Sequence, residues 1–356
     1  MLYLRSEHKK TLLIIFLALL GIGLGVGIFF LINNQPLSSN PIKNIAQNLN
    51  PVQQEIDEPF KEMTVPYLKS RSYESNLGDL DQTTQNSDYT SYLTDYDSDG
   101  LRINGLLTIP EGDQPVNGWP AIIFIHGYIA PSTYSTLTRY VDHVNYLARN
   151  GFVVFKIDLR GHGNSEGDPG GAYYSEDYII DALNARAALQ SADFVNPDGI
   201  GLWGHSMAGN VVLRSIAARP DIPAVVIWAG AVYTYEDFQE YRLNDNSYRP
   251  PSMSTMRSAR RQQLFDTYGE FDPNSSFWSK VPATNYLPNI KSAIQLHHSV
   301  DDNVVSVRYS RNLNEILDST SILHEFYEYN GAGHNISGSS FNSAMQRTVD
   351  FFKENL

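Results

Sequence analysis

A serine set among small residues is the first group in the sequence that could do chemistry. Residues 200–209 read IGLWGHSMAG, a short apolar strand pattern that runs into Ser206 and then into a helical pattern. A reactive serine must stand on a tight strand-to-helix turn, so small residues are needed on both sides, here Gly204 and Ala208. The usual last glycine is replaced by Ala208, although Gly209 follows directly. The stretch predicts Ser206 as a nucleophile, but taken alone it is more often a structural turn.

Partners for this serine stand further along the chain. An alcohol is a poor nucleophile near neutral pH and needs a histidine base, together with an acid that fixes the tautomer of the histidine. Residues 298–304 read HSVDDNV directly after a predicted strand, and residues 330–335 read NGAGHN. We predict His334 as the general base and Asp301 as the acid, with Asp302 as the second choice. Alone, each would be explained as a turn cap or a surface histidine; together they indicate acyl transfer.

An acyl-transfer site also needs backbone N–H groups that bind the oxyanion. One is usually donated by the residue after the nucleophile, here Met207, and the other by a loop that follows an earlier strand. The strand pattern at residues 121–125 runs into His126-Gly127-Tyr128. The glycine lets the loop turn toward the site, so we predict Tyr128 and Met207 as the oxyanion hole.

The elements that must position these groups alternate along the chain. Apolar, β-branched runs bounded by Gly and Pro predict strands, and apolar residues at helical spacing predict helices between them. Such alternation predicts an α/β fold with a mostly parallel central sheet that helices cover on both faces. The predicted strands are 101–109, 121–125, 152–157, 200–203, 224–228, 293–297 and 322–329, and the predicted helices are 140–149, 176–190, 207–219 and 340–355.

Composition limits the partners. The formal charge of −13 and the pI near 5.1 disfavour nucleic acid, because phosphate binding needs clustered Lys and Arg. The chain has no cysteine, which excludes disulfides, thiol nucleophiles and cysteine-based metal sites. We expect no metal in the site.

The N-terminal region predicts a membrane anchor. Residues 11–32 form an uncharged apolar run of a length that spans a bilayer as a helix. Basic residues precede the run, and none follows it until Lys43, so the positive-inside rule puts residues 1–10 in the cytoplasm. Residues 33–88 are predicted to be a flexible linker. The catalytic domain, residues 89–356, would then lie outside the cytoplasm on a single-pass membrane protein, whose oligomeric state the sequence leaves open.

Several ordered motifs resemble the α/β-hydrolase superfamily. They include DLRGHGNSEG at 158–167, GHSMAG at 204–209, VDDNVV at 300–305 and GAGHN at 331–335. The chain is most similar to the catalytic domain of the prolyl oligopeptidase family, with its dipeptidyl-peptidase and acylaminoacyl-peptidase relatives. The resemblance implies an α/β-hydrolase fold, a Ser206, Asp301 and His334 triad, the same oxyanion hole, and no cofactor. The β-propeller of larger family members has no counterpart here, so an esterase is a serious rival to a peptidase.

The insertion at residues 233–288 is too long for a simple strand connection and resembles a helical lid. Its aromatic residues either shape a substrate pocket or pack the lid onto the core. The predicted substrate-binding residues are Tyr235, Phe238, Tyr241 and Trp278. The lid also carries arginines that could meet a substrate carboxylate or simply form a solvated helix face, namely Arg249, Arg257, Arg260 and Arg261.

Three functions follow from these features. The leading one is a membrane-anchored serine peptidase that cleaves a peptide or other amide through an acyl-serine intermediate. The alternative is a carboxylesterase or lipase-like hydrolase that acts on a small-molecule ester. An alternative of another class is a non-catalytic, membrane-tethered binding protein on the same fold.

Overall fold

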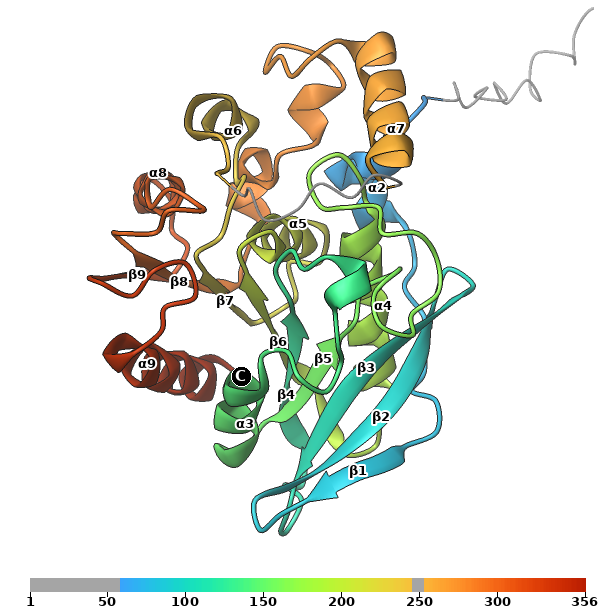
Figure 1. The fold of residues 1–356 in the computed structure, drawn as a ribbon, viewed down its shortest axis with the longest axis vertical. Coiled ribbons are helices and arrows are strands. Elements are labelled where there is room, and N and C mark those ends of the chain that lie inside the picture. The colour runs from blue at the N-terminus through green and yellow to red at the C-terminus, as the bar shows by residue number, and fades with distance from the viewer. Residues whose placement is uncertain (1–57, 245–252) are drawn as a thin grey trace, which may run out of the picture. The chain divides into compact units, whose positions relative to one another are not determined.

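The computed structural model describes residues 58–244 and 253–356 (Figure 1). The predicted cytoplasmic segment 1–10, the predicted transmembrane helix 11–32 and the first part of the predicted linker lie outside the described residues. Within the described ranges, no helix is both long and apolar enough to span a bilayer. Residues 58–356 cluster as one compact unit.

A mixed sheet organises this unit. Its strands lie in the order β1-β2-β3-β5-β4-β6-β7-β8-β9 within the described residues. The pairs from β5 to β9 are parallel, whereas β1, β2, β3 and β5 pair antiparallel. The predicted α/β fold with a mostly parallel sheet is confirmed. The strands are β1 (Asp81–Gln85), β2 (Tyr89–Ser98), β3 (Leu101–Pro110), β4 (Trp119–Ile125), β5 (Val153–Ile157), β6 (Val195–His205), β7 (Ala224–Trp228), β8 (Ala293–Ser299) and β9 (His324–Tyr329).

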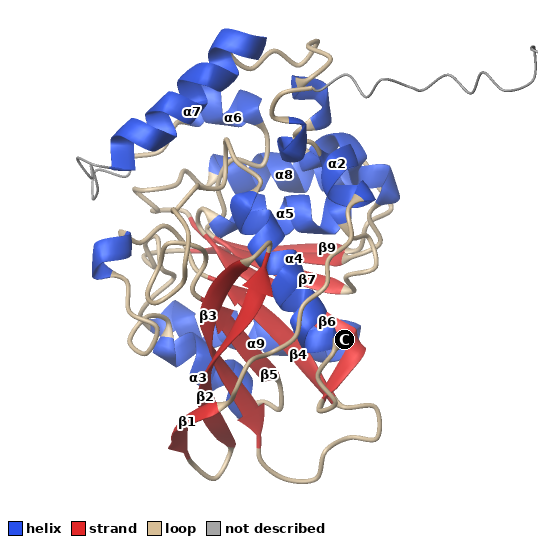
Figure 2. Cartoon of the chain, turned by 90° about the vertical axis from the view of Figure 1, so that its right-hand side faces the viewer, coloured by secondary structure: helices blue, strands red, loops and turns tan. Residues whose placement is uncertain are grey.

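Helices cover both faces of the sheet (Figure 2). One core packs α4 and α5 against the sheet, and a second core packs α3 and α9 against the other face. The central strands β4, β5 and β7 are buried at nearly every position, as expected for strands covered on both sides. The longer helices outside the insertion between β7 and β8 are α3 (Val141–Arg149), α4 (Asp177–Gln190), α5 (Ala208–Ala218), α8 (Arg308–Asp318) and α9 (Ser339–Asn355).

The folded unit begins earlier than the sequence predicted. The linker was expected to end at residue 88, but residues 58–70 form the 3-10 turn Lys61–Met63 and the helix α2 (Val65–Ser70). The side chains of Met63, Val65 and Leu68 are fully buried, and α2 packs against α5. The predicted boundary at residue 89 is therefore wrong, because three apolar residues in a polar tract are enough to fix a short helix on a ready-made core.

The insertion between β7 and β8 is helical, as predicted for a lid. It contains α6 (Tyr235–Tyr241), α7 (Met253–Tyr268) and the 3-10 turns Trp278–Lys280 and Ala283–Asn289. Figures 1 and 2 show α6 and α7 at the end of the unit opposite β1. The lid has its own apolar core, to which the N-terminal segment contributes Met63.

Candidate active site

Ser206 sits at the turn between β6 and α5. Its φ angle is 54°, in the left-handed region that is costly for a residue with a side chain. The turn holds this conformation because the Ser206 N–H donates to Trp228 O at 2.9 Å and its carbonyl accepts from the N–H of Gly209 and Ala231. Strand and helix pass so closely that a Cβ on Gly204 would lie 2.7 Å from Val212 Cγ2. This close approach explains why glycine precedes the serine by two residues.

His334 lies beside this serine. Its Nε2 is 3.0 Å from Ser206 Oγ, and its Nδ1 is 2.7 Å from Asp302 Oδ2. The His334 ring also packs against the His205 ring, with ring centroids 4.7 Å apart. A hydroxyl, an imidazole and a buried carboxylate thus stand in one hydrogen-bonded row, the arrangement that activates a serine.

The carboxylate in this row belongs to Asp302, so the first-choice prediction of Asp301 is wrong. The Asp302 side chain is fully buried and accepts from the N–H groups of Val304 and Val305 at 2.8 and 3.0 Å. Its Oδ2 also lies 3.2 Å from Nε2 of His298. Burial acts to raise the pKa of Asp302, but hydrogen bonds from His298 and His334 outweigh it, and the pKa lies well below its usual range. Asp302 is therefore ionised whenever the protein is folded near neutral pH.

Asp301 has a different position. Its carboxylate is exposed and accepts from Ser299 Oγ and from the N–H groups of Ala332 and Gly333, at 3.1 and 3.4 Å. The hydrogen bond from Ser299 is the largest cause that lowers the pKa of Asp301. Asp301 thus fastens the loop that carries His334, whereas Asp302 contacts the histidine itself. Two adjacent carboxylates at a strand end cannot be told apart by sequence when the turn alone decides which one faces inward.

A second histidine links the loops around the site. His205 Nε2 lies 3.0 Å from the carbonyl oxygen of His334, so this nitrogen carries the proton and donates. His205 Nδ1 then accepts from the Tyr140 hydroxyl at 2.8 Å, and that hydroxyl accepts from the N–H of Gly127 at 3.0 Å. Burial holds the pKa of His205 well below its usual range, which keeps the ring neutral. This chain joins the loop after β4, the serine turn and the loop of the base.

The predicted oxyanion donors lie next to the serine. Tyr128 and Met207 both line a cavity that also contains Ser206. Because the N–H of Gly127 donates to Tyr140, the next N–H along the loop is the one at Tyr128. The predicted pair is thus brought together around Ser206.

Two cavities meet at Ser206. The first has a volume of about 340 Å³, and its walls are largely apolar and aromatic, including Tyr173, Tyr174, Phe238 and Val304. The second, of about 490 Å³, is lined by His334, Asn335 and residues of the loop after β4. Tyr128 and Ser206 line both. A substrate bond held at Ser206 would therefore have one part in each cavity.

The predicted substrate-binding residues divide between wall and core. Of the four predicted residues, Tyr235, Phe238, Tyr241 and Trp278, only Phe238 belongs to the described lining of the first cavity. Tyr235 and Trp278 are buried in the lid core, and the Tyr235 hydroxyl donates to the carbonyl oxygen of Tyr173, a wall residue. Tyr241 packs edge-on against Tyr309. For these three residues the prediction of substrate contact is wrong. Tyr235 and Trp278 form the apolar interior that the lid needs, and Tyr241 packs against the main core instead.

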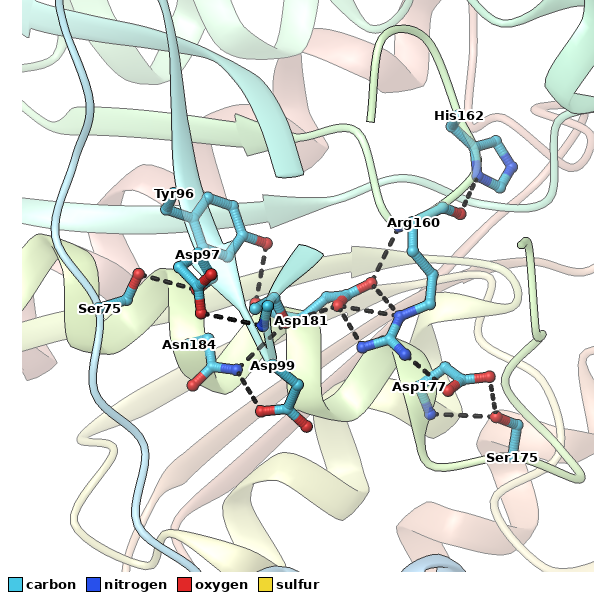
Figure 3. A network of polar contacts seen from close by, with 12 residues as sticks. Ser75, Tyr96, Asp97, Asp99, Arg160, His162, Ser175, Asp177, Asp181 and Asn184 are labelled. Atoms are coloured by element: carbon cyan, nitrogen blue, oxygen red, sulfur yellow. Dashed lines mark hydrogen bonds and ion pairs between the residues drawn. The ribbon is translucent and has the colours of Figure 1, made fainter. Parts of the chain in front are cut away.

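The motif DLRGHG contributes Arg160 to a network of polar contacts that reaches the wall of the first cavity. Figure 3 shows the Arg160 guanidinium between Asp181 and Asp177. Its nitrogens lie 2.7 Å from an Asp181 carboxylate oxygen and 2.8 Å from one of Asp177. Asp177 in turn lies directly under Gly170, where a Cβ would come 1.6 Å from its Oδ2. Gly170 begins the wall segment of the first cavity, and the buried Arg214 donates to the carbonyl oxygens of Ala172 and Ser175 at 3.4 and 3.1 Å. Two arginines thus fix the wall.

Sequence reasoning missed three residues near the site. His298 is the second partner of Asp302, His205 carries the link between loops, and Tyr140 completes that link. A histidine inside the GHSMAG stretch was a visible signal, but its partners come from residues 65 positions upstream and 129 positions downstream. No local pattern predicts such pairings.

Comparison with known proteins agrees with this geometry. A family model described as "Serine aminopeptidase, S33" matches residues 120–255. The thiohydrolase AneE of Aspergillus aculeatus is 33% identical over 111 residues, which is 31% of this chain and 32% of that protein. Human dipeptidyl peptidase 8 is 29% identical over 179 residues, 48% of this chain and 19% of that protein. The chain thus spans about a third or less of these curated relatives.

A solved structure shows the same fold. The acetyl xylan esterase from Paenibacillus sp. R4 superposes with a TM-score of 0.61 at 17% identity, covering 82% of this chain and 92% of the esterase. The matched family model is one of serine peptidases, and the row of Ser206, His334 and Asp302 is the arrangement that such an enzyme needs. The chain thus has an α/β-hydrolase fold, and parts of its sequence are similar to a serine aminopeptidase family model and to dipeptidyl peptidase 8.

Proposed function

We propose that the chain is a serine hydrolase that cleaves a carboxylic ester or amide through an acyl-Ser206 intermediate. The observation that carries the proposal is the row in which Ser206 Oγ, the His334 ring and Asp302 are joined at 3.0 and 2.7 Å. In our proposal Asp302 takes the role that the sequence had assigned to Asp301. The strained turn at Ser206 and the two cavities that meet there support it.

The proposed reaction has two halves. The Ser206 oxygen attacks the substrate carbonyl and its proton passes to His334 Nε2, while Asp302 stabilises the imidazolium that forms. The negative oxygen of the tetrahedral intermediate is bound by the N–H groups of Tyr128 and Met207. His334 then protonates the leaving oxygen or nitrogen, and the carbon–heteroatom bond breaks. A water molecule, activated by the same histidine, releases the acid and regenerates the serine.

The two cavities give the substrate a direction. A general acid must lie within hydrogen-bond reach of the leaving atom, and His334 lines the second cavity but does not belong to the described lining of the first. The leaving group is therefore placed in the second cavity, beside Thr138, Arg139 and Asn335. The acyl group is placed in the first, against Tyr173 and Phe238.

The first cavity favours an acyl group without a positive charge. An exopeptidase of the aminopeptidase type must bind a free ammonium group, which requires a carboxylate or several carbonyl acceptors. The described lining of the first cavity includes no Asp or Glu. We therefore place a carboxylesterase, or an amidase that accepts a neutral or blocked acyl group, ahead of an aminopeptidase. The resemblance to dipeptidyl peptidases supports the peptidase alternative.

The first experiment measures hydrolysis and labelling with the full-length chain, purified in detergent. A fluorophosphonate probe should label the wild type and the surface variant Ser343→Ala, but not Ser206→Ala. Turnover of p-nitrophenyl esters without turnover of aminoacyl-nitroanilides would establish the esterase branch, and anilide turnover that Ser206→Ala abolishes would establish a peptidase. Folded protein that is neither labelled nor active would refute the proposal and favour a binding protein on this fold.

We also propose that residues 11–32 anchor the enzyme in a membrane with the catalytic unit on the extracytoplasmic side. The uncharged apolar run and the basic residues before it support this. The test is fractionation of cells that express the full chain, followed by protease treatment of intact cells. Recovery of the chain in the soluble fraction after high-salt and carbonate washes would refute it.

A further inference from the structure

Charge is distributed unevenly around the first cavity. The chain carries a formal charge of −13, yet the charged side chains in the described lining of this cavity are two arginines, Arg260 and Arg261. Both come from the lid helix α7. The second cavity, by contrast, contains Arg139 and Asp142, whose charges balance. Among the described lining residues, those of the first cavity therefore carry a net positive charge and those of the second do not.

One of the two arginines is already neutralised. Arg260 donates from Nη2 to both carboxylate oxygens of Glu176, at 3.0 and 2.7 Å, and the Glu176 side chain is only 11% exposed. Its guanidinium therefore completes an internal ion pair. Arg260 also lies over the ring of Phe60, 5.3 Å from its centroid, which ties the lid to the N-terminal segment.

Arg261 has no such partner in the described part of the chain. Its guanidinium carbon lies 4.7 Å from the ring centroid of Tyr174 and 5.0 Å from that of Phe265. Stacking on aromatic rings holds the guanidinium in place, yet leaves its N–H edges available. Tyr174 is a wall residue of the same cavity, so the guanidinium is fixed at the cavity rim. Within the described residues, no carboxylate lies within ion-pair distance of Arg261.

We infer that the preferred substrate has an acyl group that ends in a carboxylate, which Arg261 binds at the rim of the first cavity. The inference rests on the proposed function. The acyl chain would run from the carbonyl at Ser206 along the apolar wall formed by Phe238 and Val304, and its terminal carboxylate would meet the guanidinium edge. A planar guanidinium matches a carboxylate with two parallel hydrogen bonds, so the substrate class is a monoester or monoamide of an apolar dicarboxylic acid.

The test compares two substrates that differ only in the far charge. The p-nitrophenyl monoester of suberic acid is hydrolysed beside the same compound capped as its methyl ester, with the uncatalysed rates subtracted. The readout is the ratio of kcat/KM for the anionic substrate to that for the capped one, because this ratio cancels differences in active protein. The enzyme is the full-length chain as wild type, Arg261→Gln, Arg261→Glu, and the surface control Arg149→Gln.

We expect the ratio to favour the anion in the wild type and to fall about fivefold in Arg261→Gln, the effect of one partly exposed charge pair. Arg261→Glu should lower it further, Arg149→Gln should leave it unchanged, and 1 M salt should reduce the wild-type preference, because the rim is exposed. A ratio near one that Arg261 variants do not change would overturn the inference while leaving the hydrolase intact. If neither substrate reacts and the fluorophosphonate labels nothing, the proposed function itself is refuted instead.

Discussion

The two neighbouring aspartates at the end of β8 are expected to differ sharply in their effect on catalysis. Asp302→Asn should lower kcat by about 10³- to 10⁴-fold, because it removes the charge next to the base and presents an amide to His334 Nδ1. Asp301→Asn should lower kcat by less than about tenfold. Its side chain contacts Ser299 and the backbone of the histidine loop, and an asparagine oxygen can still accept from those donors.

The magnitude follows from the contacts. A 10³- to 10⁴-fold loss corresponds to roughly 4 to 5.5 kcal/mol of transition-state stabilisation, since about 1.4 kcal/mol changes a rate tenfold. Replacing an ionic hydrogen bond by a neutral one accounts for about 1.5–3 kcal/mol of this. The remainder comes from the tautomer. Four donors converge on Asp302, and an amide has only one oxygen for them, so its NH₂ group would favour the His334 tautomer in which Nε2 carries the proton and cannot act as a base.

The assay is steady-state hydrolysis of a p-nitrophenyl ester by both variants in the full-length chain, with circular dichroism and thermal melting to verify folding. Both variants should bind substrate with a similar KM, because neither carboxylate lines the acyl cavity. If Asp301→Asn loses as much kcat as Asp302→Asn, or more, the assignment of Asp302 as the acid is wrong. If Asp302→Asn melts far below the wild type, the buried cluster with His298 is primarily structural.

Three further predictions concern the surroundings of the triad. His205→Phe keeps the ring that packs on His334 but breaks the link to Tyr140, so kcat should fall about tenfold with KM little changed; an unaltered kcat would show that the link positions nothing. Arg160→Met leaves Asp181 buried without its partner and should cost about 3–5 kcal/mol of folding stability in urea unfolding, whereas a loss below about 1 kcal/mol would contradict the role of this ion pair. Burial raises the pKa of Asp158 to about 6. Between about pH 4 and 6 the folded state therefore keeps a proton on this carboxyl that the unfolded state has lost. The free energy of unfolding should fall by roughly 3 kcal/mol as the pH rises through that window. Asp158→Asn should remove that slope from unfolding measured between pH 4 and 6, and an unchanged slope would show that other groups produce it.

The sequence predicted the strand pattern and the histidine well. A short, fully apolar and β-branched run such as AVVIW favours a buried strand over a helix, and the predicted bounds agree with β7 at Ala224–Trp228. His334 follows Gly331 and Gly333 in a loop after a strand, and its order after Ser206 and the Asp301-Asp302 pair indicated a base. These features depend on local patterns and on their order along the chain, which is why they could be read from the sequence.

Other elements could not be predicted because their stability comes from distant contacts. The edge strand β1 reads DQTTQ and is exposed at every position, so it has no alternation of apolar and polar residues to reveal it. It exists because it pairs with β2. The helix α2 is only six residues long and depends on the core formed by α5. The same is true of Asp302, which differs from its neighbour only in the direction that the turn gives its side chain.

The N-terminal segment and the lid form one interlocked piece. The carbonyl oxygen of Pro59 accepts from the Tyr268 hydroxyl, Lys280 pairs with Glu58, and Met63 packs into the lid core. A change of acyl specificity through the lid therefore has to be matched by changes near residue 60. In a set of homologues, the residues around position 60 should covary with those at 260–280 more strongly than with the catalytic strands. Exchanging lids between such homologues should yield active chimaeras only when residues 58–70 are exchanged with them.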